Sequence, residues 1–193
     1  FVKSAIIVLL PAAACFIALM DCITAPSISL EGRSLWLIRS LPVKGEDVLE
    51  SKINLHLIVN MPPTAILVFV AGIIFGCSAQ ESIIMMVTAL LFVYLFALLG
   101  IMFGLRKPRF DWTNETIPIK QSMSVLFGLL GGWATQLIFA GLFLLLRLKF
   151  DINIQGIKYL QYTIVILMAF IILMRRWIRD KGAKKFEALS SPL

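Results

Sequence analysis

Five long runs of apolar residues, separated by short polar segments, make up most of this 193-residue chain. An α-helix needs about 20 apolar residues to cross the hydrocarbon core of a membrane. Strands of a membrane barrel would instead show alternating segments of about ten residues, and these runs are continuous. The pattern predicts an all-α, polytopic membrane protein with a single transmembrane domain over residues 1–193. The expected spans are residues 4–25, 53–77, 82–105, 122–146 and 157–177.

Lys and Arg residues are distributed unevenly between the connections of this predicted bundle. Segments 27–52 and 106–121 carry four each and segment 175–185 carries six, of 18 in the chain, whereas the connection after the second span carries none. Basic residues collect in cytoplasmic loops. We therefore expect a plasma-membrane protein whose first residue lies outside the cell. Segments 27–52 and 106–121 and the tail, residues 178–193, then lie in the cytoplasm.

The composition agrees with a membrane environment. Hydrophobic residues make up 60% of the chain, charged residues 15%, and the mean hydropathy is +0.93. A net charge of +7 would suggest nucleic acid in a soluble protein, but basic cytoplasmic loops account for it more simply, and we expect no nucleic-acid partner. The three cysteines have no metal or disulfide spacing and are interpreted as small packing residues.

Glycines recur at four-residue spacing in three of the predicted spans. Residues four apart share one face of a helix, so such pairs allow a neighbouring helix to approach closely. The pattern predicts either ordinary packing within the bundle or a face against a second half or a second copy of the chain. We also expect kinks or breaks at Pro11 and at Pro62-Pro63. The glycine pairs are Gly72/Gly76, Gly100/Gly104 and Gly128/Gly132.

Residues that could carry catalysis are few. His56 and Asn60 share a helical face, as in some intramembrane proteases, but no Glu-Glu pair accompanies them and His56 is the only histidine in the sequence. We interpret His56 as an interfacial residue and Asp21 as a structural or capping group, and expect no catalytic residues and no metal site. The sequence contains no G-x-x-x-x-G-K-[ST] phosphate loop, so no cofactor is expected on this chain.

The segment SLEGRSLWLIRSLPVKGEDVLESK, residues 29–52, is polar overall but has a short apolar centre. On a helix over residues 30–41, Leu30, Leu37 and Leu41 fall on one side, while Leu35 and Trp36 lie among polar residues. A helix lying on the lipid surface would explain the first group but not the second. A protein docking from the cytoplasm would explain Leu35 and Trp36. Both readings stay open on the pattern alone.

Two cytoplasmic segments resemble those of ABC exporter permeases of the type 2 class, mostly from Gram-positive bacteria. The first matches the pattern S-x-E-G-[KR]-x-x-W-x-x-[KR]-S-L-P followed by a Lys, and the second is RKPRFDWTNETIPIKQS. The resemblance covers the chain as roughly the C-terminal half of such a permease. The positions of the first pattern are Ser29, Glu31, Gly32, Arg33, Trp36, Arg39, Ser40, Leu41, Pro42 and Lys52.

The resemblance implies a membrane-spanning permease subunit of an ATP-driven exporter that pairs with a separate cytoplasmic ATPase, where ATP is bound. It also implies that the short helix is a coupling helix seated on the ATPase, with Leu35 and Trp36 facing it. Other expected partners are membrane lipids and a second permease half or a second copy. The implied coupling residues are Glu31, Gly32, Arg33, Leu35, Trp36, Arg39, Leu41 and Pro42, and those of the second loop are Asp111, Trp112, Asn114, Glu115, Lys120 and Gln121.

Two alternatives come from other functional classes. A membrane-embedded enzyme of the intramembrane-protease type would use the His56 and Asn60 pair, and the missing acidic partners count against it. A non-transporting assembly or immunity protein would also lack catalytic residues. Co-purification with an ATPase separates the first interpretation from both alternatives.

Overall fold

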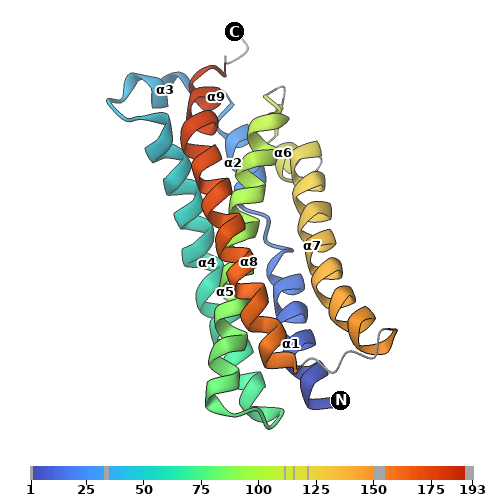
Figure 1. The fold of residues 1–193 in the computed structure, drawn as a ribbon. Coiled ribbons are helices and arrows are strands. Elements are labelled where there is room, and N and C mark those ends of the chain that lie inside the picture. The colour runs from blue at the N-terminus through green and yellow to red at the C-terminus, as the bar shows by residue number, and fades with distance from the viewer. Residues whose placement is uncertain are drawn as a thin grey trace.

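A computed structural model describes residues 2–32, 35–110, 112–114, 116–120, 122–149 and 155–189. All secondary structure in these residues is helical, and the protein is an all-α polytopic membrane protein (Figure 1). Four helical stretches of the described residues, built on α4, α5, α7 and α8, are long and apolar enough to cross a membrane. The helices are α1 Val2–Ala18, α2 Thr24–Leu30, α3 Leu35–Ser40, α4 Gly45–Ile74, α5 Ala79–Arg106, α6 Thr116–Lys120, α7 Met123–Leu148, α8 Gly156–Trp177, the π-helix η2 Ile178–Gly182 and α9 Ala183–Glu187.

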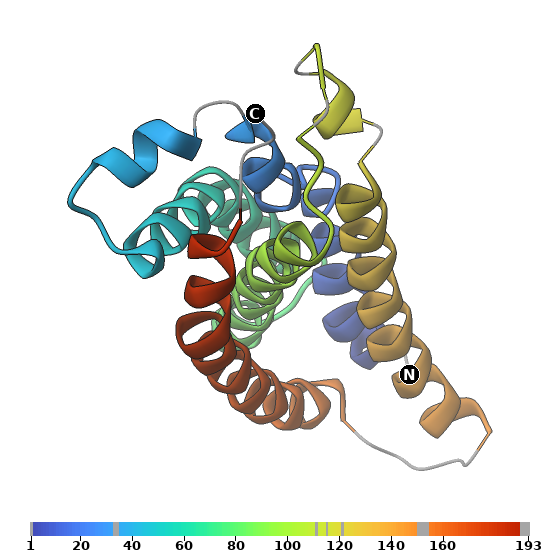
Figure 2. The same ribbon diagram turned by 90° about the horizontal axis from the view of Figure 1, so that it is seen from above.

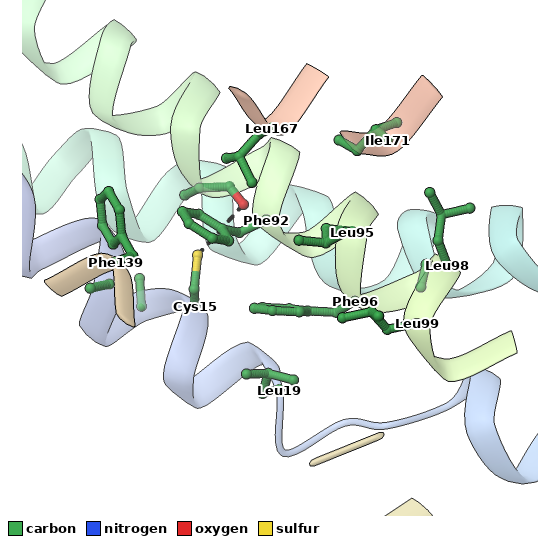
Figure 3. Close-up of a cluster of buried hydrophobic side chains, with 14 of the residues drawn as sticks. Cys15, Leu19, Phe92, Leu95, Phe96, Leu98, Leu99, Phe139, Leu167 and Ile171 are labelled. Carbon is green, nitrogen blue, oxygen red and sulfur yellow. Dashed lines mark hydrogen bonds between the residues drawn. The ribbon is translucent and has the colours of Figure 1, made fainter. Parts of the chain in front are cut away.

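Helix α5 forms the centre of the bundle. It packs against α1, α2, α4, α7 and α8, which surround it in the view along the bundle (Figure 2). Its middle is buried on nearly every side, from Phe92 to Ile101. Figure 3 shows how Phe92, Leu95 and Phe96 of α5 face side chains of α1, α7 and α8. The thiol of Cys15 donates to the carbonyl of Ala89 at 3.5 Å, which ties α1 to this centre.

The outer helices have apolar exteriors and more polar inner faces, as a lipid environment favours. On α4 the buried face includes His56, Asn60 and Thr64, while Ile58 and Ile66 are 71% and 65% exposed. Asn60 donates to the carbonyl of His56 at 3.3 Å. The His56 side chain is only 3% exposed inside the bundle, and its place at the membrane interface stays a prediction.

The predicted span over residues 4–25 is not a single helix. Helix α1 ends at Ala18, the backbone from Leu19 to Ile23 is non-helical, and α2 begins at Thr24. Non-helical backbone at membrane depth is tolerated where protein surrounds it. Hydropathy does not decrease through this break except at Asp21, so the apolar pattern could not reveal it. In contrast, neither Pro11 nor Pro62-Pro63 interrupts its helix, so the breaks expected there are absent.

Glycines of α5 and α7 make room for the broken segment. A Cβ on Gly104 would lie 2.8 Å from the carbonyl oxygen of Ala25, and one on Gly128 would lie 3.1 Å from Sγ of Cys22. A Cβ on Gly100 would collide with Thr24, and one on Gly132 with Leu19. These four glycines thus pack within the bundle, against the end of α1 and the start of α2.

The other glycine pair behaves differently at its two positions. A Cβ on Gly72 would lie 2.6 Å from Oγ of Ser82, so this glycine brings α4 close to α5. Gly76 lies in the turn after α4 with φ 75°, and no atom lies within 4 Å of the position of its Cβ. Gly76 therefore allows the turn and takes no part in packing.

Helices α2, α3, α6 and α9 lie at one end of the bundle, far from the N-terminus (Figure 1). We call this end the basic end, because it carries Lys44, Lys52, Arg106, Lys107 and the basic residues of η2 and α9. The turn between α4 and α5 lies at the opposite end (Figure 1). The three basic segments of the sequence thus gather on one side of the apolar helices.

Candidate interface at the basic end

Ser29 connects the two sequence segments that carry the family resemblance. The backbone N–H of Arg109 donates to Oγ of Ser29 at 3.0 Å, and Nε1 of Trp112 donates to the Ser29 carbonyl at 2.7 Å. Ser29 is fully buried in α2. A buried serine is stable only when its polar atoms have partners. The connection after α5 is therefore fixed onto α2 by residues 80 or more positions apart in the chain.

Glu31 and Lys52 form an ion pair beneath the same connection. The Lys52 ammonium bonds Oε1 of Glu31 and also donates to the carbonyl of Ser27 at 3.2 Å. The two side chains are only 18% and 12% exposed, respectively. A shielded pair with an additional hydrogen bond is stronger than a surface pair. Glu31 thus acts inside the fold, holding the end of α2 against α4.

Gly32 lies under the indole ring of Trp112. A Cβ at this position would be 3.0 Å from Nε1 and 3.4 Å from Cε2 of Trp112. A larger residue would push the ring away from its hydrogen bond with Ser29. Ser29, Glu31, Gly32 and Lys52 of the first motif, with Trp112 of the second segment, therefore form one internal clamp, which we call the Ser29 clamp.

Helix α3 is shorter than predicted and presents the other side. The expected helix over residues 30–41 is divided, because α2 ends at Leu30 and α3 covers only Leu35–Ser40. Leu35 is 1% exposed, whereas Leu37 and Leu41 are 49% and 52% exposed. Leu35 is therefore buried against the rest of the chain and does not face a partner, whereas the expectation that Leu37 and Leu41 are held by the bilayer or bundle stays a prediction. The faces predicted for these residues assumed one continuous helix over residues 30–41.

A small apolar surface remains open beside this helix. Leu37, Leu41 and Val43 are each about half exposed, and Pro42 lies between them. We call these four residues the α3 patch. The patch is carried by a segment that the Ser29 clamp holds at one edge and the start of α4 at the other.

The tail supports the start of α4. The backbone N–H of Gly45 donates to Oε1 of Glu187 at 3.1 Å. A Cβ on Gly45 would lie 3.0 Å from Cγ of Glu187 and 3.2 Å from the carbonyl of Ala183. Helix α9 therefore packs directly on the first turn of α4, next to the α3 patch. No pattern in the sequence predicts this contact, which joins residues 142 positions apart.

The remaining predicted residues are only partly described. Asn114 accepts from the backbone N–H of Thr116 at 3.1 Å and so caps the beginning of α6, which is a local structural role. Arg33, Asp111, Glu115 and Gln121 lie outside the described residues, as do the side chains of Trp36, Arg39 and Lys120. In the described part of the chain, no cluster of His, Cys, Asp or Glu could hold a metal ion.

A family described as "Putative ATP-binding cassette" matches residues 2–128, more than half of the chain. The chain belongs to this ABC transporter family. The match includes the Ser29 clamp and all of α1 to α6. No curated protein and no solved structure matches this ABC transporter family member.

The family match corrects the predicted function. Its description names an ATP-binding cassette, so the prediction of a permease subunit of an exporter is wrong, although the assignment to ABC transporters is right. The prediction relied on apolar helices and on two motifs. The helices are long and apolar enough to cross a membrane, and the described motif residues mainly form the Ser29 clamp. Neither feature specifies a transported molecule.

Proposed function

We propose that this ABC transporter family member is the membrane-embedded part of an ATP-dependent assembly, and that its basic end contacts the ATP-binding subunit. The observation that carries the proposal is the construction of the basic end. The Ser29 clamp ends at Gly32 before helix α3, and helix α9 packs on the start of α4 after it, while the apolar side chains of Leu37 in α3 and Leu41 just beyond its end stay exposed. Interfaces are built around such apolar anchors on rigid supports.

We place ATP on a separate subunit in this proposal. The sequence contains no phosphate loop, and its described helices are largely apolar on their outer faces. The proposal also places the basic end in the cytoplasm, because Lys and Arg are concentrated there.

The test compares charge substitutions inside and outside the α3 patch. Leu37→Glu with Leu41→Glu places two charges on the patch, while Ser51→Glu places a charge on an exposed position of α4 at the same end. We expect the double variant to lose most of the co-purified ATP-binding subunit per inserted chain, and Ser51→Glu to retain it.

The membrane insertion of all variants is measured by carbonate extraction, so that loss of fold is separated from loss of contact. Equal capture by the double variant and by the wild type would contradict the contact. Photo-crosslinking of labelled ATP to the purified chain alone would contradict the placement of ATP on another subunit.

A further inference from the structure

A cavity of about 630 Å³ lies between α4 and α8 at the basic end of the bundle. Both helices pack against α5. Tyr94 of α5 contributes to the lining. The volume is within the range of small-molecule sites in proteins, roughly 300–1,000 Å³.

The lining changes from charged to apolar along the helix axes. Glu46, Glu50, Arg175, Arg176 and Arg179 line the part near the basic end. The deeper part is lined by Ile53, Leu57, Met61 and Ile172. With a helical rise of 1.5 Å per residue, Met61 lies about 16 Å further along α4 than Glu50. The cavity is therefore amphipathic along its length.

The rim carries more positive than negative charge. Arg175 bonds Glu50 across the cavity, which occupies one arginine and one carboxylate. Arg179 has a longer ion pair, 3.7 Å, with Asp180 on the exposed surface. Arg176 has no ion-pair partner among the described residues, and it follows Arg175 directly at the end of α8. The free donors of Arg176 and Arg179 suit an anionic group with several oxygen atoms.

The surroundings of the cavity are those of a lipid-facing surface. On α4, Leu55 and Ile58 beside the lining residues are 54% and 71% exposed, and on α8 Leu173 is 62% exposed. An occupant can therefore enter sideways from the membrane. A soluble anion would fill the rim and leave the apolar depth empty.

We propose that this cavity binds an anionic glycerophospholipid, with its phosphate between Arg176 and Arg179 and an acyl chain along Leu57, Met61 and Ile172. Basic pockets between membrane helices on the cytoplasmic side are suited to such head groups. The proposal does not depend on contact with an ATP-binding subunit. The proposal gives the basic residues at the end of α8 a role in binding lipid, in addition to their contribution to the positive charge of the tail.

The test is lipid binding to the delipidated protein in detergent, measured by native mass spectrometry with phosphatidylglycerol and with phosphatidylcholine of the same acyl chains. Arg176→Gln with Arg179→Gln is expected to lower the apparent phosphatidylglycerol affinity at least tenfold, since each basic side chain contributes about fivefold to the attraction of an anionic lipid. Lys184→Gln with Lys185→Gln removes the same charge from exposed positions on α9 and is the matched control. It is expected to change the affinity less than about twofold.

A second variant guards against misfolding of the arginine variant. Met61→Trp fills the deep part of the cavity without a change of charge, and is expected to lower phosphatidylglycerol binding as well. Equal losses in the arginine and lysine variants would overturn the proposal, because they would indicate general attraction to the basic tail. Equal binding of both lipids would also overturn it, and so would full competition by glycerol 3-phosphate or ATP, since these lack an acyl chain.

Discussion

Replacement of Gly104 by alanine tests whether the close approach of α2 and α5 is essential to the fold. The new Cβ would lie 2.8 Å from the carbonyl oxygen of Ala25 and 3.1 Å from Cδ1 of Ile28. Ordinary van der Waals contact begins at 3.4 Å, so the backbones must separate by about 0.6 Å. The main obstacle is a backbone atom, and α2 is held in place by the Ser29 clamp.

The size of the effect follows from two opposing terms. Forcing a methyl group into a packed site costs about 1–3 kcal/mol. Alanine in place of glycine within a helix returns up to about 1 kcal/mol. We therefore expect Gly104→Ala to lower the free energy of unfolding by up to about 2 kcal/mol.

Two further glycines provide a graded comparison. No atom lies within 4 Å of the Cβ position on Gly141 of α7, so Gly141→Ala is expected to be neutral or stabilising by up to about 1 kcal/mol. In Gly128→Ala the new Cβ lies 3.1 Å from the side-chain tip of Cys22, which can turn away. The free energy of unfolding of this variant is expected to fall between those of the other two. The assay is reversible unfolding by SDS in mixed micelles, followed by tryptophan fluorescence. A Gly104→Ala protein as stable as Gly141→Ala would refute the reasoning.

Three other predictions concern the ends of the bundle. With the native cysteines replaced, Ser78→Cys should react with an impermeant maleimide added outside cells and Ser40→Cys should not; reaction of the latter alone would reverse the orientation. Trp112→Phe keeps an aromatic ring but removes the indole N–H that donates the 2.7 Å hydrogen bond to Ser29, so it should destabilise the clamp by about 1–2 kcal/mol and speed proteolysis of the loop before α6. Burial, and secondarily the charge of Glu81, raises the pKa of the Cys77 thiol, so its alkylation by iodoacetamide should increase only at higher pH than that of a free cysteine; the same pH profile for both would contradict this.

The long helices could be predicted because each extends over many apolar residues, and the sum over such a window is robust. The break between α1 and α2 could not be predicted in this way. Residues 19–25 are as apolar as the spans apart from Asp21, and what permits the break is the space above Gly100, Gly104, Gly128 and Gly132. The glycine spacing is visible in the sequence, but the segment that packs on these glycines lies about 80 to 110 residues away.

The burial of Leu35 could not be predicted for a similar reason. A helical wheel assigns faces only when the helix is continuous, and α3 begins anew at Leu35 after α2 has ended at Leu30. The burial of Leu35 and exposure of Leu37 follow from that new phase. The pairing of Ser29 with Trp112, across 83 positions, leaves no periodic signal at all.

The residues that make the first motif recognisable and the residues available to a partner are therefore largely different sets. Glu31 and Gly32 are engaged inside the Ser29 clamp, whereas Leu37 and Leu41 are half exposed beside it. Substitution of Glu31 or Gly32 would loosen the Ser29 clamp just before α3, so it would reduce any activity of the basic end without a direct contact being lost. Substitution of Leu37 or Leu41 would leave the Ser29 clamp intact. Only a measurement of partner binding per correctly folded chain can separate these two causes, because activity alone would assign the contact to the motif.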